Sequence, residues 1–581
     1  MEPRARSSAR QGLFVVVLAV LACCGSAYSQ AVSPDLAVQE GLRRQEERAR
    51  EQQRERGAAS SELAPARPQA SRHGFPQEAR CFVINEIALA GPDAPRFRWL
   101  ADAALPYLRR CVGVLGLSHI ASDLDRALRD AGYATTRVTL PPQSLEAGQL
   151  QLHVQAGRVD SIRMVDAGAQ PQVPDARWGT WRNAFPVSVG DILNVRDLEQ
   201  GVENMNRLPG QNVSTRLEPG EGANGSVVII ERMGGAISDR LRGGVSLDNA
   251  GSPSLGRAQL SASLAVDNPS GLNDILSASL STNAQQPAST RRSQSLGVSY
   301  SLPWGYNLLS LNASHSRFAQ HVQGTTVRFL SSGQSDSAGI KAQRTVWRGT
   351  SARLDAHAAL STRRAQSYLD DVEIIVQRRR TTSMETGISY RQLFESASVE
   401  ADLAYRRGVP WRDAQEDLAS AATGGLTLRP RIWLFNASVT GDMTLGGRPV
   451  QYNAALRMQQ TGDAALSIDQ FAIGGRSSVR GFDGDSVLIA ESGVVLRNEL
   501  ATPVTLWGGM AAQAVLAVDV GRVHGPSDAF LPGRSLVGLA AGLRGRSGAT
   551  QFETLLAVPL RYPQGFSTRP FSVYASVTHS F

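Results

Sequence analysis

The stretch Phe571-Ser572-Val573-Tyr574-Ala575-Ser576-Val577-Thr578-His579-Ser580-Phe581 alternates apolar and polar side chains. Successive side chains of a β-strand point to opposite faces, so one face of this strand carries Phe571, Val573, Ala575, Val577 and Phe581. The other face carries Ser572, Tyr574, Ser576, Thr578 and Ser580. Such a strand is typical of the wall of a transmembrane β-barrel, whose apolar face contacts lipid while its polar face lines a watery interior.

The same alternation extends back to about Gly235. Short runs separated by Gly, Asn, Asp and Ser show it, as in RAQLSASLAV (257–266), NLLSLNASHS (307–316) and MAAQAVLAVDV (510–520). At about 10 residues per strand plus turns, residues 235–581 can supply roughly sixteen strands. A soluble β-rich domain is the alternative, but the number of strands and a secretory signal sequence at the N-terminus favour a membrane barrel.

The N-terminus has the three parts of a secretory signal peptide. Basic residues at 4–10 precede an apolar run at 13–22, and Ala27-Tyr28-Ser29 supplies a small-x-small cleavage site. The apolar run is too short to span a bilayer, which takes about 20 residues. A lipoprotein signal ending before Cys23 is the alternative, but the residues before that cysteine fit it poorly. We therefore assign residues 1–29 to a signal peptide.

Two cysteines remain in the mature chain, Cys81 and Cys111, because Cys23 and Cys24 leave with the signal. In an oxidising compartment a single pair most simply forms one disulfide. A metal site is the alternative, but no His cluster at ligand spacing accompanies the pair. We favour the disulfide and expect neither a metal nor a cofactor.

Residues 35–56, DLAVQEGLRRQEERAREQQRER, are dense in Arg, Glu and Gln. Glu40 and Arg44 form an i,i+4 pair that favours a helix. This helix would have almost no apolar stripe, so it must lie in water or in a wet channel. A solvated, partly disordered leader is the alternative. Residues 57–79, rich in Ala, Pro and Ser, are typical of a flexible tether.

Residues 80–157 predict a small α+β domain. The strand CFVINEIAL (81–89) precedes a helix over 97–110 and a second helix that Ser118 caps and Gly132 ends. The strands YATTRVTL (133–140) and QLQLHV (149–154) follow. The order β-α-α-β-β is that of a POTRA domain.

Residues 158–234 repeat that order in outline. A first strand precedes a helix over 195–207 that Asn194 caps, and the strands VSTRL (213–217) and SVVIIE (226–231) follow. Two consecutive domains with one element order are better evidence than either alone.

Charge and motifs argue against other classes of protein. The formal charge of +8 is spread along the chain, so we interpret it as a cationic lumen and periplasmic surface and expect no nucleic-acid partner. The eight histidines are scattered, and no nucleophile elbow, Walker loop or dinucleotide fingerprint stands in context. We therefore expect no enzymatic activity.

Two short motifs carry a more specific signal. Val479-Arg480-Gly481-Phe482 lies in a Gly/Ser-rich loop between membrane-type strands, and AVDVG (517–521) surrounds Asp519. With CFVINEIALAG (81–91) and the barrel entry that starts at Arg242, they resemble the two-partner secretion transporters (the TpsB family, haemolysin activation/secretion type). The resemblance covers essentially the whole mature chain.

The resemblance implies an outer-membrane β-barrel of about sixteen antiparallel strands, preceded by two periplasmic α+β POTRA domains and an N-terminal helix. Such a protein, a monomer in a Gram-negative bacterium, exports one large unfolded exoprotein without ATP. The client would be a haemolysin, a haemagglutinin or adhesin, or a contact-dependent inhibition toxin, recognised through its N-terminal secretion domain. Further partners would be outer-membrane lipid and, during biogenesis, periplasmic chaperones and the barrel assembly machinery. A BamA-like assembly factor and a passive, ion-conducting porin are the alternatives.

The resemblance also assigns residues. A loop near 472–488 would fold back into the barrel of residues 235–581, where Arg480 of the 479–482 motif would pair with Asp519. Residues 30–56 would be a helix that plugs the pore. The terminal strand, through Phe571, Val573 and Phe581, would carry the signal that the assembly machinery reads.

Overall fold

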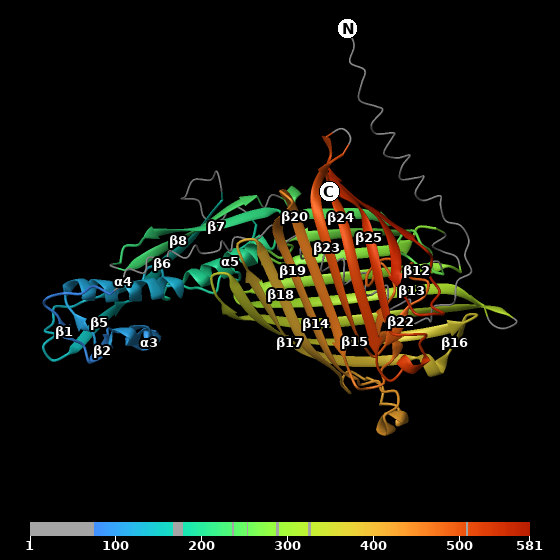
Figure 1. The fold of residues 1–581 in the computed structure, drawn as a ribbon, viewed down its shortest axis with the longest axis horizontal. Helices are drawn as coiled ribbons and strands as arrows, with labels where there is room; N and C mark the ends of the chain where they lie inside the picture. Colours follow the sequence, from blue (N-terminus) through green and yellow to red (C-terminus); the bar gives the residue numbers. More distant parts are fainter. Residues whose placement is uncertain are drawn as a thin grey trace, which may run out of the picture.

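The computed structural model describes residues 75–166, 178–222, 224–234, 237–252, 254–285, 290–323, 327–506 and 509–581. The predicted signal peptide, the predicted plug helix and the linker as far as residue 74 lie outside these residues. Figure 1 shows two small α+β domains on the left and a large closed barrel on the right.

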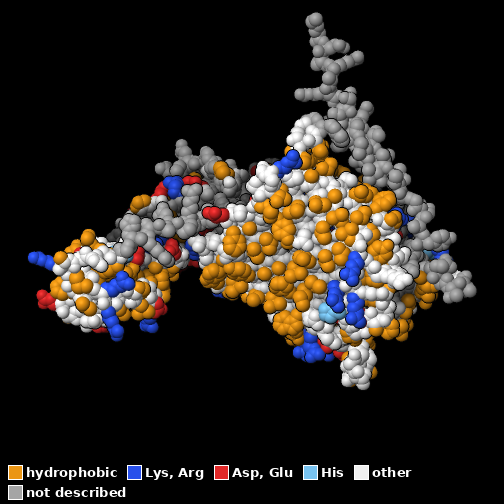
Figure 2. Space-filling view, viewed as in Figure 1, with side chains coloured by type: hydrophobic (Ala, Val, Ile, Leu, Met, Phe, Trp, Pro, Cys, Tyr) orange, Lys and Arg blue, Asp and Glu red, His pale blue; other side chains and the backbone are white. Residues whose placement is uncertain are grey.

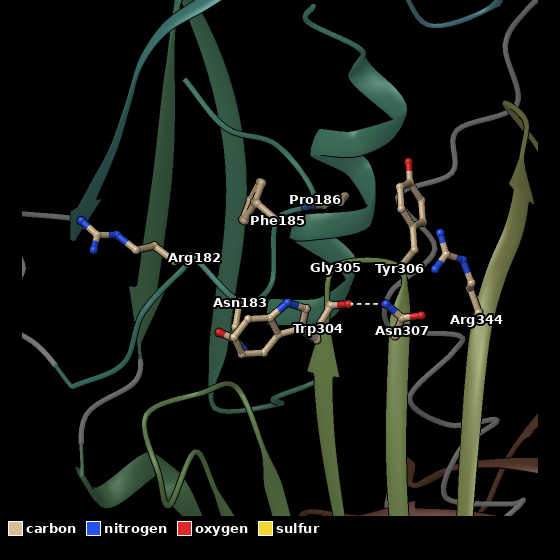
Figure 3. Close-up of a pocket in the computed structure, with 9 residues that line it drawn as sticks. All are labelled: Arg182, Asn183, Phe185, Pro186, Trp304, Gly305, Tyr306, Asn307 and Arg344. Atoms are coloured by element: carbon tan, nitrogen blue, oxygen red, sulfur yellow. Dashed lines mark hydrogen bonds between the residues drawn. The ribbon is translucent and has the colours of Figure 1, made fainter. Parts of the chain in front are cut away.

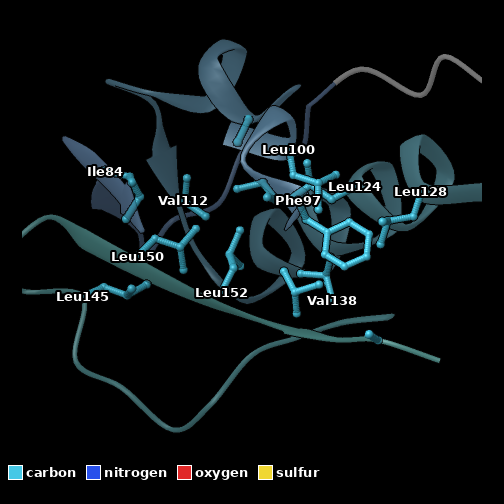
Figure 4. Close-up of a cluster of buried hydrophobic side chains, with 14 residues drawn as sticks. Ile84, Phe97, Leu100, Val112, Leu124, Leu128, Val138, Leu145, Leu150 and Leu152 are labelled. Atoms are coloured by element: carbon cyan, nitrogen blue, oxygen red, sulfur yellow. The ribbon is translucent and has the colours of Figure 1, made fainter. Parts of the chain in front are cut away.

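The first domain has a three-stranded sheet in the order β2-β5-β4, with β2 parallel and β4 antiparallel to β5. Its strands are β1 (Phe82–Val83), β2 (Glu86–Ala90), β3 (Cys111–Val112), β4 (Arg137–Thr139) and β5 (Gln149–Gln155). Its helices are α3 (Trp99–Ala104) and α4 (Val114–Asp130), with short 3₁₀ turns at Ala94–Phe97 and Leu105–Tyr107. Figure 4 shows its core, where Leu150 and Leu152 of the sheet lie opposite Leu124 and Leu128 of α4. The predicted order β-α-α-β-β is present.

Two helix predictions in this domain were wrong in detail. The predicted helix over 97–110 is only α3 and a 3₁₀ turn, since Pro106 cannot continue the α-helical hydrogen bonds. Ser118 does not cap α4, because the helix begins at Val114 and the Ser118 hydroxyl donates to the Val114 carbonyl (3.1 Å). Glu78 accepts hydrogen bonds there instead, from the backbone N–H groups of residues 113, 115 and 116 (3.0, 2.9 and 2.7 Å). Burial opposes ionisation of Glu78, but these hydrogen bonds outweigh it and lower its pKa.

The second domain has the sheet order β6-β8-β7, with β6 parallel to β8. Its elements are β6 (Arg158–Asp166), α5 (Val195–Asn206), β7 (Gln211–Pro219) and β8 (Gly225–Gly234). The Asn194 side chain accepts a hydrogen bond from the Arg196 N–H (2.8 Å), so the predicted N-cap of this helix is confirmed.

The barrel closes on itself through sixteen antiparallel strands within the described residues. They are β9 (Leu241–Asp248), β10 (Gln259–Asp267), β11 (Ile275–Asn283), β12 (Arg292–Trp304), β13 (Asn307–Gln323), β14 (Arg328–Arg348), β15 (Ala352–Leu369), β17 (Arg379–Leu393), β18 (Ala397–Gly408), β19 (Arg431–Leu445), β20 (Arg448–Gln460), β23 (Ser492–Thr505), β24 (Ala511–His524), β25 (Ser535–Ser547), β26 (Thr550–Arg561) and β27 (Ser572–Ser580). The two-residue β16 (Val372–Glu373) extends β15. At the seam, β27 pairs with β9, and Phe581 and Gly243 exchange backbone hydrogen bonds (3.0 and 2.9 Å). The predicted barrel of sixteen antiparallel strands after two α+β domains is confirmed, whereas the predicted N-terminal helix lies outside the described residues.

The strands of the wall alternate as expected. On β27, Phe571 and Val573 are exposed while Ser572 and Tyr574 are buried. The barrel face seen in Figure 2 is correspondingly dominated by hydrophobic side chains. Because β9 starts beside the second domain, the loops after β9, β11, β13, β15, β18, β20, β24 and β26 lie at the far end of the barrel. In the described residues, the structure has no helix that is long and apolar enough to cross a membrane.

The second domain is docked on the barrel through α5. Asn204 Nδ2 donates to the Gly305 carbonyl in the turn between β12 and β13 (2.7 Å). Arg348, at the end of β14, donates to Glu203 of α5 (2.6 Å), and Arg353 of β15 pairs with the same carboxylate. Burial opposes ionisation of Glu203, but the guanidinium groups of Arg353 and Arg348 outweigh it and hold its pKa below the ordinary value. This joint (α5 with the β12–β13 and β14–β15 turns) ties the two parts together.

A small pocket lies beside this joint (Figure 3). Its volume is about 240 Å³, and it is lined by residues of both parts, among them Asn183, Phe185, Trp304 and Arg344. In Figure 3 the turn at Trp304 and Asn307 carries one internal hydrogen bond, from Asn307 Nδ2 to the Trp304 carbonyl (3.2 Å). Ligand pockets commonly hold roughly 300–1,000 Å³. We therefore interpret the pocket as a gap in the joint.

Candidate functional site

The segment between β20 and β23 folds back against the barrel wall. It contains β21 (Phe471–Ile473), which pairs with β22 (Leu488–Ala490). An apolar cluster joins the segment to the wall and consists of Phe471, Ile473, Val479, Phe482, Leu488, Ala490, Val495, Val523, Leu536 and Phe566. The predicted loop near 472–488 lies within this segment, which we call the lumenal loop (461–491).

Arg480 of the lumenal loop contacts Asp519 of β24. Its Nε donates to Asp519 Oδ2 (2.7 Å) and its Nη2 donates to Oδ1 (2.8 Å), while its backbone N–H donates to Oδ2 (2.9 Å). Arg480 is 3% exposed and Asp519 is fully buried. Two parallel hydrogen bonds between a guanidinium and a carboxylate fix both position and orientation. We call this pair the lock.

The lock belongs to a larger charge network. Arg480 Nη1 donates to Glu499 Oε2 of β23 (2.6 Å), and Arg544 of β25 donates to Glu499 Oε1 (3.0 Å). Arg544 also donates to Glu553 of β26 (3.0 Å), whose other oxygen accepts from Arg476 of the lumenal loop (2.8 Å). Guanidinium and carboxylate groups therefore alternate. Charged contacts attach the loop to β23, β24 and β26, and Arg544 of β25 bridges the two glutamates.

Two glycines and a tyrosine let the loop backbone touch the wall. Gly481 has φ +114°, and a Cβ there would stand 2.5 Å from a carbonyl oxygen of β26. A Cβ on Gly538 of β25 would stand 1.6 Å from the Arg480 carbonyl oxygen. The Tyr574 hydroxyl accepts from the Gly481 N–H (3.1 Å) and donates to the Phe482 carbonyl (2.7 Å). The loop therefore fits this wall only while both positions lack side chains.

This arrangement can hold or release a segment inside the barrel. Both partners of the lock are shielded from water, so removing one strands the other charge at a cost of about 3–5 kcal/mol. The described residues contain no cluster of side chains suited to a metal ion. The lock and the apolar cluster supply reversible ion pairing and packing.

The other predicted site residues lie away from the lumenal loop. Cys81 and Cys111 form a disulfide bond in the first domain. Phe571 and Val573 are exposed on the outer face of β27, and Phe581 lies at the seam, beside Gly243.

Sequence reasoning missed the partners of the lock on the neighbouring strands. Glu499 and Glu553 each stand as the single carboxylate in a long, otherwise mostly apolar strand, VVLRNELATPV (494–504) and QFETLLAVPL (551–560). An ionisable residue at membrane depth is by default a functional candidate, and this signal could have found them.

Family models match nearly all of the described chain. The model described as "Haemolysin secretion/activation protein ShlB/FhaC/HecB" matches residues 224–545. POTRA domain models match residues 82–157, where the model is of the ShlB type, and 158–219. The chain belongs to the haemolysin secretion/activation protein ShlB/FhaC/HecB family.

Named relatives agree with this assignment. The outer membrane transporter CdiB-2 of Burkholderia pseudomallei (strain 1026b) is 32% identical over 526 residues, which cover 87% of this chain and 88% of the relative. The haemolysin transporter protein ShlB of Serratia marcescens is 26% identical over 472 residues, covering 81% and 80%. Among solved structures, CdiB from Escherichia coli has a TM-score of 0.81 and 27% identity, covering 96% of this chain and all of the other.

The chain is therefore an outer-membrane transporter of the two-partner secretion type, with its POTRA domains in the periplasm. The predicted family, function and location are confirmed. A BamA-like assembly factor has less support, because these relatives are named as transporters.

Proposed function

We propose that this transporter exports a large exoprotein of the contact-dependent inhibition class, and that the lumenal loop is the gate that the client must displace. The gate is inferred from the buried pair of hydrogen bonds that the Arg480 side chain donates to Asp519. The client class rests on similarity, because the relative at 32% identity and the structure at TM-score 0.81 are both CdiB proteins.

Client capture is proposed at the edge of a POTRA sheet. Among the described residues, β7 of the second POTRA domain pairs with β8 alone. On its other edge the Asn206 side chain bonds the Val213 N–H and carbonyl (2.7 and 2.9 Å), so the edge that a peptide could extend lies over residues 214–219. An extended peptide can add there as a strand, and the backbone of an unfolded client offers the same groups whatever its side chains. The joint through Glu203 would hold this edge at the periplasmic mouth of the barrel.

Two further roles are proposed for segments at the ends of the chain. The polar segment 30–56 is proposed to plug the lumen, since a helix that is polar all round suits a wet channel. Phe581 is proposed as part of the signal that the barrel assembly machinery reads. Deleting Phe581 should lower the amount of folded barrel in the outer membrane, and an unchanged amount would remove that role.

The client class can be tested by supplying clients to one transporter. The chain would be expressed with the secretion domain of a contact-dependent inhibition exoprotein or with that of a haemolysin. The proposal expects secretion of the first domain, measured in the culture medium, to exceed that of the second severalfold. Equal secretion of both, or preference for the haemolysin domain, would overturn the client class while leaving the transporter assignment intact.

A further inference from the structure

Arginines gather on the outer face of the barrel at the ends of strands far from the POTRA domains. On β18 and β19 the odd-numbered side chains face outward, since Leu403 and Trp433 are exposed while Ala404 and Ile432 are buried. Arg407 and Arg431 are therefore on the outward face, and both are exposed. In Figure 2 the Lys and Arg side chains on the visible barrel face likewise gather toward its lower edge.

The strand register places these arginines directly opposite each other. Arg407 of β18 pairs with Arg431 of β19, and Arg364 of β15 pairs with Arg380 of β17 in the same way. Like charges directly opposite across an antiparallel pair are destabilising. Two such pairs at the same end of the barrel therefore concentrate positive charge there and require anions to neutralise them.

The chain's own carboxylates neutralise these arginines only in part. Arg431 binds Asp463 through two hydrogen bonds from its side chain (3.1 and 2.7 Å), and Arg380 binds Asp413 (2.7 Å). The hydrogen bond from Arg431 lowers the pKa of Asp463, and the nearby charge of Arg407 lowers it further, so both arginines act on one carboxylate. The β18–β19 pair thus has two guanidiniums against one carboxylate, and its remaining positive charge can bind an anion.

Two aromatic rings mark the depth of the β18–β19 pair. Tyr405 and Trp433 lie two residues inward of Arg407 and Arg431 on the same face, with ring centroids 4.9 Å apart. Aromatic girdles of membrane barrels sit at the boundary between hydrocarbon and headgroups. The two arginines therefore lie at the level of the headgroups of the outer leaflet.

We propose that the outer ends of β18 and β19 bind the phosphate of a phosphorylated glycolipid in the outer leaflet. The Arg407 and Arg431 guanidiniums would donate to the phosphate oxygens, for which their planar fork is suited. The Tyr405 and Trp433 rings would contact the upper part of the acyl chains. The site is on the outside of the wall, so it is independent of the lock and of the client.

The test measures lipid binding to the full-length transporter by native mass spectrometry. The probes are a bisphosphorylated lipid A and the same glycolipid without its phosphates. The Arg407→Gln/Arg431→Gln variant should bind the phosphorylated lipid at least about tenfold more weakly than the parent, as expected for loss of a charge-assisted hydrogen bond. The parent should bind the dephosphorylated lipid equally weakly, and millimolar inorganic phosphate should not compete.

Arg448→Gln is the matched control, since Arg448 is exposed at the POTRA-side end of β20, on the same face as the exposed Met458. It should bind the phosphorylated lipid like the parent. If the double variant does not fold, Arg407→Gln alone gives the test without disturbing the Arg431–Asp463 pair. Unchanged binding in the Gln variants, equal binding of the dephosphorylated lipid, or competition by free phosphate would each overturn the proposal.

Discussion

Replacing Gly538 with alanine should release the lumenal loop without altering any charge. The new Cβ would stand 1.6 Å from the Arg480 carbonyl oxygen, whereas ordinary contacts begin at 3.4 Å. The carbonyl must therefore withdraw by about 1.8 Å. The hydrogen bond from the Arg480 backbone N–H to Asp519, now 2.9 Å, would then be lost. The two hydrogen bonds from the Arg480 side chain to Asp519 would be strained or broken as well.

The free energy that the docked loop loses can be estimated from the hydrogen bonds that break. A hydrogen bond to a charged group contributes about 1.5–3 kcal/mol, so losing two favours the displaced loop by at least about 3 kcal/mol. That corresponds to roughly a hundredfold change in the ratio of closed to open loop. Single-channel recording in planar bilayers should therefore show Gly538→Ala open far more often than the parent.

Gly462→Ala is the control, because a Cβ at this position of the same loop meets no atom within 4 Å. It should conduct like the parent. If folded Gly538→Ala also conducted like the parent, the close approach of Arg480 to β25 would not hold the loop, and the reasoning would be refuted.

The Arg480→Ala variant should still insert into the outer membrane as a folded barrel but should export far less client. Normal export by this variant would show that transport does not need the lock. Deleting residues 35–56 should raise the conductance, whereas an unchanged conductance would exclude a plug. The pKa of Glu203 is lower in the folded chain than in the unfolded one, so its ion pairs stabilise the joint above pH about 4.5 and this contribution is lost as pH falls through the folded value. The difference in Tm between parent and Glu203→Gln should therefore be constant near neutral pH and shrink in acid; a difference independent of pH would contradict this. Non-reducing peptide mapping should recover Cys81 joined to Cys111, and free thiols in exported protein would contradict the disulfide.

The sequence predicted the barrel because its side chains follow a local rule. Strand alternation has a period of two residues, so the faces of β27 could be assigned without knowing any neighbour. The N-cap at Asn194 was also local, since its side chain bonds Arg196 two residues later. Ser118 failed as a cap because the true partner of α4 is Glu78, which is 35 residues from Gly113.

The site was predictable only in part for the same reason. The pairing of Arg480 with Asp519 came from resemblance to a family. The roles of Glu499, Glu553 and Arg544 depend on the register between strands, which brings single charges from separate strands to one patch of wall. Sequence shows each charge but not which charges meet.

The central claim is that this transporter serves one dedicated client. The most direct measurement is quantitative mass spectrometry of the culture medium and the outer membrane, comparing a strain that lacks this chain with its parent, with the candidate client expressed in both. We expect loss of one very large secreted or surface protein, with all other barrels unchanged. A broad loss of outer-membrane barrels, or no change in either fraction, would contradict the account.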